Sequence, residues 1–185
     1  MKFLIAGLLS ILLLLSQQAN SATSTSIDKL PLADLPEYSK VYDDTRDPFQ
    51  DARDALALAQ QTNRQVLIEI GGNWCTWCHK VDNFLANNPD IYQTLHENYV
   101  LLKVNVSDSN ENEAFMSGLP PVLGYPHMYI STAQGKMLLS KDTAELLSGD
   151  NYSRSNWLAF LDKWSLKQQN TSKQLSNNTQ QSTEE

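Results

Sequence analysis

The sequence predicts an α/β domain in which helices flank a central mixed β-sheet. Two runs of β-branched and aliphatic residues, 66–70 and 99–106, are typical of buried strands. Between them lie two segments with helical spacing of apolar residues, 76–86 and 91–98. Helices and strands that alternate along the chain indicate a layered α/β fold.

A helix is predicted before the first strand. Asp47 is suited to cap it and Pro48 to occupy its first position, and the helical pattern continues through Gln61. Small and apolar residues form the stripe expected to face the sheet, namely Ala52, Ala55, Leu56 and Ala59.

The only two cysteines of the chain, Cys75 and Cys78, follow the first strand and a Gly-Gly break. The segment 76–86 predicts a helix, so Cys75 is expected at a helix N-terminus. Unpaired N–H groups and the helix dipole there favour an anion and lower the pKa of a thiol. Cys78, one turn along, can close a disulfide with Cys75. The pair therefore predicts the chemistry of a dithiol oxidoreductase.

The elements after this helix alternate in the same way. Pro89 breaks the pattern and Asp90 is expected to cap the helix 91–98, which leads into the strand 99–106. That strand is long and apolar enough to be central in the sheet. The segment 107–123 reads as a long connection, either functional or simply variable surface.

The C-terminal part of the domain is predicted to hold a hairpin and a helix. The strands 127–131 and 136–140 are joined through Gln134-Gly135. Ser153 is expected to cap the last helix. Its apolar residues, Trp157, Leu158, Leu161 and Trp164, are spaced for core packing.

Three features together resemble the thioredoxin superfamily over residues 38–167. Trp74-Cys-Thr-Trp-Cys78 resembles the W-C-x-x-C active site of that family, although His79 follows and thioredoxin itself has Gly-Pro between its cysteines. Glu69, six residues before the first cysteine, matches a buried acidic residue on the central strand. Gly124-Tyr-Pro126, followed by a strand, is similar to the cis-proline loop. The resemblance implies a thioredoxin-like fold and thiol-disulfide exchange.

The resemblance also implies roles for the residues around the cysteines. Cys75 would attack the substrate and Cys78 would resolve the mixed disulfide. Burial would raise the pKa of Glu69, which could then exchange a proton with Cys78. The Tyr125-Pro126 bond would be cis, and the backbone of Tyr125 would pair with substrate.

Four side chains near this centre are weaker candidates. Trp74 and Trp77 flank the reactive thiol on the substrate side, and we expect Trp74 to pack and Trp77 to contact substrate. His79, four residues after Cys75, could stabilise the thiolate, although a solvent-facing helical histidine is the simpler interpretation. His127 is a second candidate for tuning.

Other classes of protein use the same spacing. Cys75-Thr-Trp-Cys78-His79 fits the C-x-x-C-H pattern of covalent haem attachment. Its other axial ligand would be one of three methionines, Met116, Met128 or Met137. The two thiolates could also serve a soft-metal module, which would need further His, Asp or Glu ligands. An inert structural disulfide between Cys75 and Cys78 is disfavoured, because the loop that it closes is so short that the disulfide would contribute little stability.

The chain ends predict export and a polar extension. Residues 1–22 have the charged start, short apolar run and small residues of a cleavable signal peptide, which would leave no stable membrane span. Residues 23–37 are predicted to be a tether and 168–185 a disordered tail. Export together with a redox dithiol points to a bacterial periplasm.

The predicted protein is a thiol-disulfide oxidoreductase with Cys75 and Cys78 as its couple, acting without a cofactor or metal. Its partners would be proteins with cysteines or disulfides and a thiol-redox electron donor or acceptor. A reductase or isomerase is favoured over an oxidase. A net charge of −7 without a basic cluster argues against nucleic acid as a partner.

Overall fold

The computed structural model describes residues 34–181. The predicted signal peptide, residues 1–22, and most of the predicted tether lie outside the described residues. The tether's last part reaches the first short helix, α1 (Glu37–Lys40).

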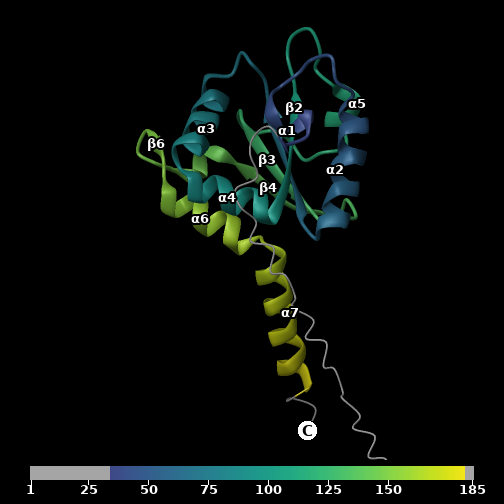
Figure 1. Cartoon of the computed structure of the whole chain (residues 1–185), viewed down its shortest axis with the longest axis vertical. Coiled ribbons are helices and arrows are strands. Elements are labelled where there is room, and N and C mark those ends of the chain that lie inside the picture. Colours follow the sequence, from purple (N-terminus) through teal and green to yellow (C-terminus); the bar gives the residue numbers. More distant parts are fainter. Residues whose placement is uncertain (1–33, 182–185) are drawn as a thin grey trace, which may run out of the picture.

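Four strands form one mixed sheet at the centre of the molecule (Figure 1). In the order β2-β1-β3-β4, β1 (Gln65–Gly71) pairs in parallel with β2 (Tyr99–Asn105) and antiparallel with β3 (His127–Ser131). The fourth strand, β4 (Met137–Asp142), pairs antiparallel with β3. The predicted α/β class and mixed central sheet are confirmed.

The strand β2 lies at an edge of the sheet, so the prediction that it is central was wrong. All of its residues are nevertheless buried, because helix α1 packs against it. The Ser39 hydroxyl of α1 donates a hydrogen bond to the Leu101 carbonyl of β2 at 2.5 Å. The apolar run therefore reflects a covered edge, which needs the same side chains as a central strand.

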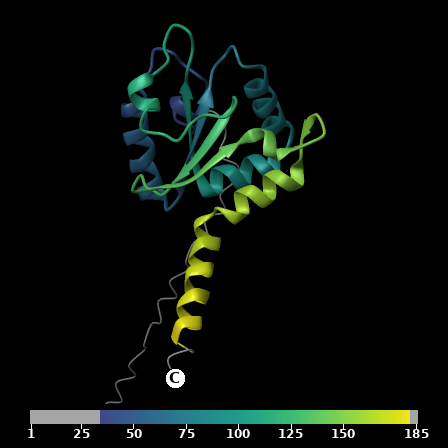
Figure 2. The same ribbon diagram turned by 180° about the vertical axis from the view of Figure 1, so that it is seen from behind.

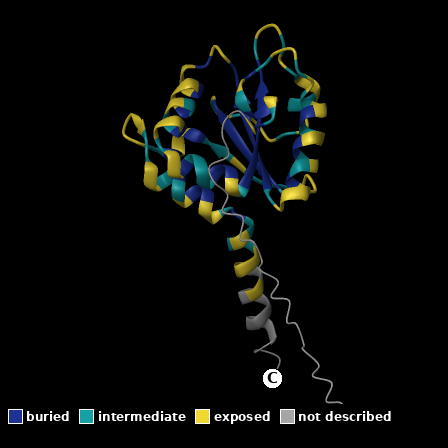
Figure 3. Ribbon diagram, in the orientation of Figure 1, coloured by how far each residue is buried: buried dark blue, intermediate teal, exposed yellow. Residues whose placement is uncertain are grey.

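Helices cover both faces of the sheet (Figures 1 and 3). On one face, α3 (Thr76–Asn87), α4 (Pro89–Asn98) and α6 (Arg154–Lys163) enclose a core that includes Leu67 of β1. On the other face, α2 (Pro48–Thr62) and α1 pack over Val66, Ile68 and Ile70. Alternate residues of β1 thus belong to different cores.

The helix starts follow the expected capping chemistry with one exception. The Asp47 carboxylate accepts a hydrogen bond from the Phe49 N–H at 2.9 Å, and Ser153 caps α6. Helix α4 begins at Pro89 with Asn88 before it, so the prediction that Asp90 caps it was wrong. Proline lacks an N–H and has a fixed φ, which suits the first helical position rather than a break.

Several short elements were not predicted. Helix α5 (Glu113–Met116) lies within the long connection. The 3₁₀ turn η2 (Thr143–Leu146) and the small hairpin of β5 (Leu147–Ser148) and β6 (Asn151–Tyr152) lie between β4 and α6. Elements of two to four residues are too short to show a periodic pattern in sequence.

Residues 166–181 form helix α7 (Leu166–Gln181), where the sequence had predicted a disordered tail from residue 168. The segment contains neither glycine nor proline, so nothing in it interrupts a helix. Figures 1 and 2 show α7 projecting from the body of the protein. Among the described helices, none combines the length and apolar character that crossing a membrane requires.

Candidate active site

Cys75 and Cys78 form a disulfide at the start of helix α3. Cys75 is the N-cap residue, and its sulfur accepts a hydrogen bond from the Cys78 N–H at 3.0 Å. The predicted place of Cys75 is confirmed. Once the disulfide is reduced, the same N–H and the helix dipole would favour a thiolate at Cys75. Both residues are buried, Cys78 completely.

The two glycines before the disulfide are required by close approaches. A Cβ at Gly71 would lie 2.6 Å from the Cys78 sulfur and 2.7 Å from the Tyr42 hydroxyl oxygen. A Cβ at Gly72 would lie 2.5 Å from the indole nitrogen of Trp74. The end of β1 therefore runs next to the disulfide. A side chain at Gly71 would displace the Cys78 sulfur or Tyr42, and one at Gly72 would displace the Trp74 indole.

Glu69 is fully buried on β1, and a few polar side chains surround it. The Tyr42 hydroxyl donates a hydrogen bond to Glu69 Oε1. Lys103 is the register partner of Glu69 on β2, and its ammonium binds the Asp82 carboxylate of α3 at 2.5 Å. Burial raises the pKa of Glu69, against the attraction of Lys103 and the hydrogen bond from Tyr42.

The second carboxyl oxygen of Glu69, Oε2, has no hydrogen-bond partner among the described residues. An ionised carboxylate left with a bare oxygen in the interior would be costly, whereas a protonated carboxyl carries no charge. The geometry thus matches a Glu69 that holds a proton while the cysteines are oxidised.

Tyr42 is a site residue that sequence reasoning missed. It forms one buried cluster with Cys75 and Cys78, while its hydroxyl bonds to Glu69. Burial, followed by the Glu69 charge, raises the pKa of Tyr42 well above its ordinary value. The phenol therefore remains protonated beside the disulfide. No local motif marks Tyr42, because it precedes Glu69 by 27 residues and meets it only through packing.

The outer side of the disulfide is aromatic. Trp74 is 56% exposed, so the prediction that it packs in the core was wrong. Its indole N–H donates a hydrogen bond to the Val106 carbonyl at 2.6 Å, which holds the ring on the surface. The ring meets Tyr125 edge to face, with 5.2 Å between centroids. Trp77, 36% exposed, instead packs edge-on against Tyr152.

The Tyr125–Pro126 peptide bond is cis, as predicted. The contact between the Trp74 and Tyr125 rings brings this loop to the disulfide, although residues 74 and 125 are far apart in sequence. The Pro126 carbonyl accepts a hydrogen bond from the Thr143 hydroxyl at 2.7 Å, which anchors the loop to η2.

The two histidines bond to groups other than the sulfurs. A ring nitrogen of His79, Nε2, lies 2.9 Å from the Asn73 carbonyl oxygen, so this side chain closes the turn before Cys75. His127 is fully buried on β3, with Nε2 2.8 Å from the Ser140 hydroxyl of β4. Burial lowers the pKa of His127, which favours the neutral ring.

The methionines considered as haem ligands lie in different places. Met128 is buried in the core on the α3 face of the sheet. Met116 and Met137 pack against the core on the opposite face, whereas His79 is on α3. Within residues 34–181, no three His, Cys, Asp or Glu side chains gather in a way that could hold a metal ion.

A family model described as thioredoxin-like matches residues 47–133. The chain is 31% identical over 84 residues to the thiol:disulfide interchange protein DsbD of Citrobacter koseri, and 29% identical over 80 residues to that of Klebsiella pneumoniae. These matches cover 44% and 43% of the chain but only 15% and 13% of the relatives. The chain thus spans a small part of their length.

A solved structure shares the fold over most of the chain. The disulphide isomerase from Xylella fastidiosa Temecula1 has a TM-score of 0.57 and 24% sequence identity, and the match covers 70% of this chain and 95% of that one. The predicted thioredoxin-like fold is confirmed.

Proposed function

We propose that the chain is a member of the thioredoxin superfamily and acts as a thiol-disulfide oxidoreductase, with Cys75 and Cys78 as its redox couple. The observation that carries this proposal is the position of the disulfide at the helix N-terminus, with Cys75 as the cap and Cys78 buried behind it. The names of the relatives, a thiol:disulfide interchange protein and a disulphide isomerase, support it.

In the reducing direction, the Cys75 thiolate attacks one sulfur of a substrate disulfide. A mixed disulfide forms and the first substrate thiolate leaves. The Cys78 thiolate then attacks the Cys75 sulfur, which closes the Cys75–Cys78 disulfide and releases the second substrate thiolate. Two electrons pass from the dithiol to the substrate, and the isomerase reaction uses the same first attack with release of a rearranged disulfide.

Cys78 is fully buried, so its thiol must lose its proton to a group inside the protein. Tyr42 supplies a path, because its oxygen and the Cys78 sulfur both border the space beside Gly71 and its O–H points to Glu69. The Cys78 proton passes to the Tyr42 oxygen as the Tyr42 proton passes to the Glu69 carboxylate. Glu69 is the base and Tyr42 the relay, and burial makes Glu69 the stronger base by raising its pKa.

The substrate would approach from the aromatic side. Trp74 and Tyr125 are exposed there, and the contact between their rings places the cis loop beside the residue that precedes Cys75. We propose that substrate backbone pairs with Tyr125, that Pro126 fixes this loop, and that His79 and His127 act only through the turn and strand they brace.

We propose the cellular setting from the N-terminal sequence. Its signal-peptide pattern supports export to a periplasm, where substrate proteins carry disulfides and a second thiol-redox protein would recycle the Cys75–Cys78 couple. The exposed aromatic site and the buried acid favour a reductase or isomerase.

Redox titration tests the function directly. The mature protein is equilibrated with glutathione buffers and its thiols are counted. We expect two thiols that titrate as one two-electron couple, with a potential nearer about −270 mV for a reductase than about −120 mV for a strong oxidant. Cys78→Ser should accumulate mixed disulfides with substrate through Cys75, and Cys75→Ser should not. Thiols that titrate independently, or equal trapping by both variants, contradict the proposal.

The haem alternative has its own test. The protein is exported in a host that matures c-type cytochromes and its absorbance is recorded before and after denaturation. A Soret band that survives denaturation would show covalent haem on Cys75 and Cys78 and would overturn the dithiol proposal.

A further inference from the structure

A groove of about 980 Å³ opens beside Trp74, the residue that precedes Cys75. Trp74 and Tyr125 form the wall nearest to Cys75. The remainder comes from the connection between β2 and β3. Its apolar lining consists of Met116, Leu119, Pro120, Pro121 and Val122, and its acidic rim consists of Asp108, Glu111 and Glu113. The long connection thus builds a surface that adjoins Trp74 and Tyr125, next in sequence to Cys75 and Pro126.

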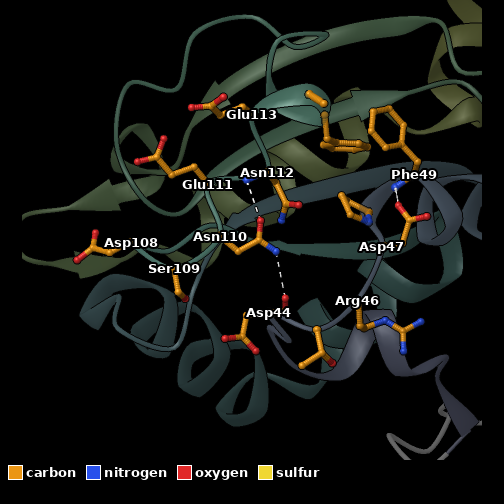
Figure 4. Close-up of a pocket in the computed structure, with 14 residues that line it drawn as sticks. Asp44, Arg46, Asp47, Phe49, Asp108, Ser109, Asn110, Glu111, Asn112 and Glu113 are labelled. Carbon is orange, nitrogen blue, oxygen red and sulfur yellow. Dashed lines mark hydrogen bonds between the residues drawn. The ribbon is translucent and has the colours of Figure 1, made fainter.

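The acidic rim carries unbalanced charge. None of the residues that line the groove is a lysine or arginine. The ion pairs formed within residues 34–181 use other carboxylates. Figure 4 shows the adjoining pocket, which Asp108, Glu111 and Glu113 also line. Their carboxylates lie along one side of the loop there. A bound cationic group would relieve their repulsion.

The loop that carries these carboxylates is braced by asparagines. The Asn110 amide donates a hydrogen bond to the Asp44 carbonyl at 3.1 Å and accepts one from the Asn112 N–H at 3.1 Å (Figure 4). The Asn112 amide donates to the Asn105 carbonyl at the end of β2 at 2.7 Å. These contacts tie the loop to β2 and to the segment before α2, so the rim is arranged before a partner binds.

We propose that this groove binds a basic-apolar segment of the substrate protein next to its reactive cysteine. An aliphatic or aromatic side chain would occupy the apolar floor, and a neighbouring lysine or arginine would reach the rim. This proposal rests on the proposed function, because it assumes that Cys75 forms a mixed disulfide with that substrate. It adds a sequence preference that the disulfide chemistry alone does not provide.

Charge favours a basic polypeptide over a second copy of this chain. The chain has 21 acidic and 14 basic residues, so a second copy would bring further negative charge to an acidic rim. Like charges placed together at an interface oppose association. A basic segment brings the complementary charge.

The test compares two peptide disulfides that differ only in the residue two places from the cysteine, Lys in one and Gln in the other, with a leucine beside it in both. Reduction by the full mature protein is followed at low salt. We expect a higher kcat/KM for the Lys peptide, by about fivefold to tenfold, since exposed ion pairs contribute modestly and several act together here. The preference should shrink at about 0.5 M salt because exposed charges are screened.

The variant Asp108→Asn/Glu111→Gln/Glu113→Gln should lose the Lys preference and keep the rate with the Gln peptide. The matched control, Asp54→Asn/Glu97→Gln/Asp162→Asn, removes the same number of exposed charges away from the groove and should keep the preference. Equal kcat/KM for both peptides in the wild type, or an unchanged preference in the groove variant, would overturn the proposal.

A small neutral disulfide, hydroxyethyl disulfide, separates this proposal from the function itself. If the wild-type protein does not react with it, the proposed function fails. If it reacts but shows no Lys preference, only the groove proposal fails. Sedimentation velocity adds one further outcome, because a dimer that weakens on substitution of Met116 or Leu119 by Ser would show that a second copy covers the groove and would overturn the proposal.

Discussion

The two sides of the Cys75–Cys78 disulfide use carboxylates in opposite ways. On the inner side Glu69 is fully buried, and its pKa is raised by desolvation against the opposing charge of Lys103. On the outer side Glu111 and Glu113 are exposed and form the rim of a groove. We therefore propose the same functional group as a proton acceptor inside and as a charged docking element outside. Burial, and not residue type, decides which role a carboxylate can take.

The largest effect is expected from Glu69→Gln. Glutamine can still accept the Tyr42 hydrogen bond but cannot take the Cys78 proton, so the resolution of mixed disulfide should slow by about 100-fold. The wild-type rate should fall as the pH decreases through the pKa of Glu69, and the variant should lack that step. Rapid-quench kinetics across pH measure both, with Glu97→Gln as an exposed control. A wild-type rate in Glu69→Gln would remove Glu69 from the mechanism.

The stability of the wild-type protein and that of Glu69→Gln should also depend differently on pH. Glu69 has a raised pKa in the folded state, so the unfolded chain releases this proton at lower pH than the folded protein does. Relative to Glu69→Gln, the wild-type protein should therefore lose stability as the pH rises from about 4.5, the ordinary pKa of a glutamate, toward the folded pKa. Urea unfolding of both oxidised proteins at several pH values measures the difference, and a pH-independent difference would contradict burial of an ionisable Glu69.

The next effect concerns space on the inner side. Gly71→Ala places a methyl group against Cys78 and Tyr42, which are both buried, so we expect about 1–3 kcal/mol of destabilisation. Urea unfolding of the oxidised protein measures it. Gly118→Ala is the matched control, because its nearest contact would be at 3.5 Å and its effect should stay within about 0.5 kcal/mol. Equal stability of the two variants would mean that the protein accommodates a methyl group beside Cys78 and Tyr42 without loss of packing.

A smaller effect is expected from Tyr42→Phe. The ring remains and the hydroxyl is lost, so resolution by Cys78 should slow by about tenfold while the first attack by Cys75 keeps its rate. Tyr99→Phe is the control, since it also removes a buried hydroxyl, one that donates to the Leu161 carbonyl at 2.7 Å, but on the far side of the core. If both variants lower stability equally and neither changes the resolution rate, Tyr42 has only a structural role.

The smallest effect belongs to the outer side. Trp74→Ala removes a half-exposed ring, so stability should change little, while the KM for a peptide disulfide should rise by about threefold. Steady-state kinetics with a peptide and with hydroxyethyl disulfide measure the two substrates separately. An equal loss of activity with both substrates would mean that Trp74 affects the reaction of Cys75 itself and not substrate docking. It would contradict the division of roles between the two sides of the disulfide.

Much of the fold was predictable because its signals are local. The capping residue Asp47, the helical spacing after Cys75 and the two apolar runs each act within a few residues along the chain. Errors arose where a local pattern fits two tertiary settings. The run 99–106 is compatible with either a central strand or a covered edge strand. A tryptophan before a cysteine can either pack in the core or lie on the surface, where one hydrogen bond holds the Trp74 ring.

The sequence by itself determined the cysteine pair and the helix that carries it, because these depend on short-range spacing. The cis loop was predicted from the resemblance to a known family. Tertiary structure decided what surrounds them. Tyr42 donates a hydrogen bond to Glu69, Lys103 lies beside Glu69 on the neighbouring strand, and Asp108 and Trp74 line one groove. These residues come together only when the layers pack. Contacts between residues so distant along the chain follow from how whole elements pack together, and such packing leaves no periodic signal in the sequence.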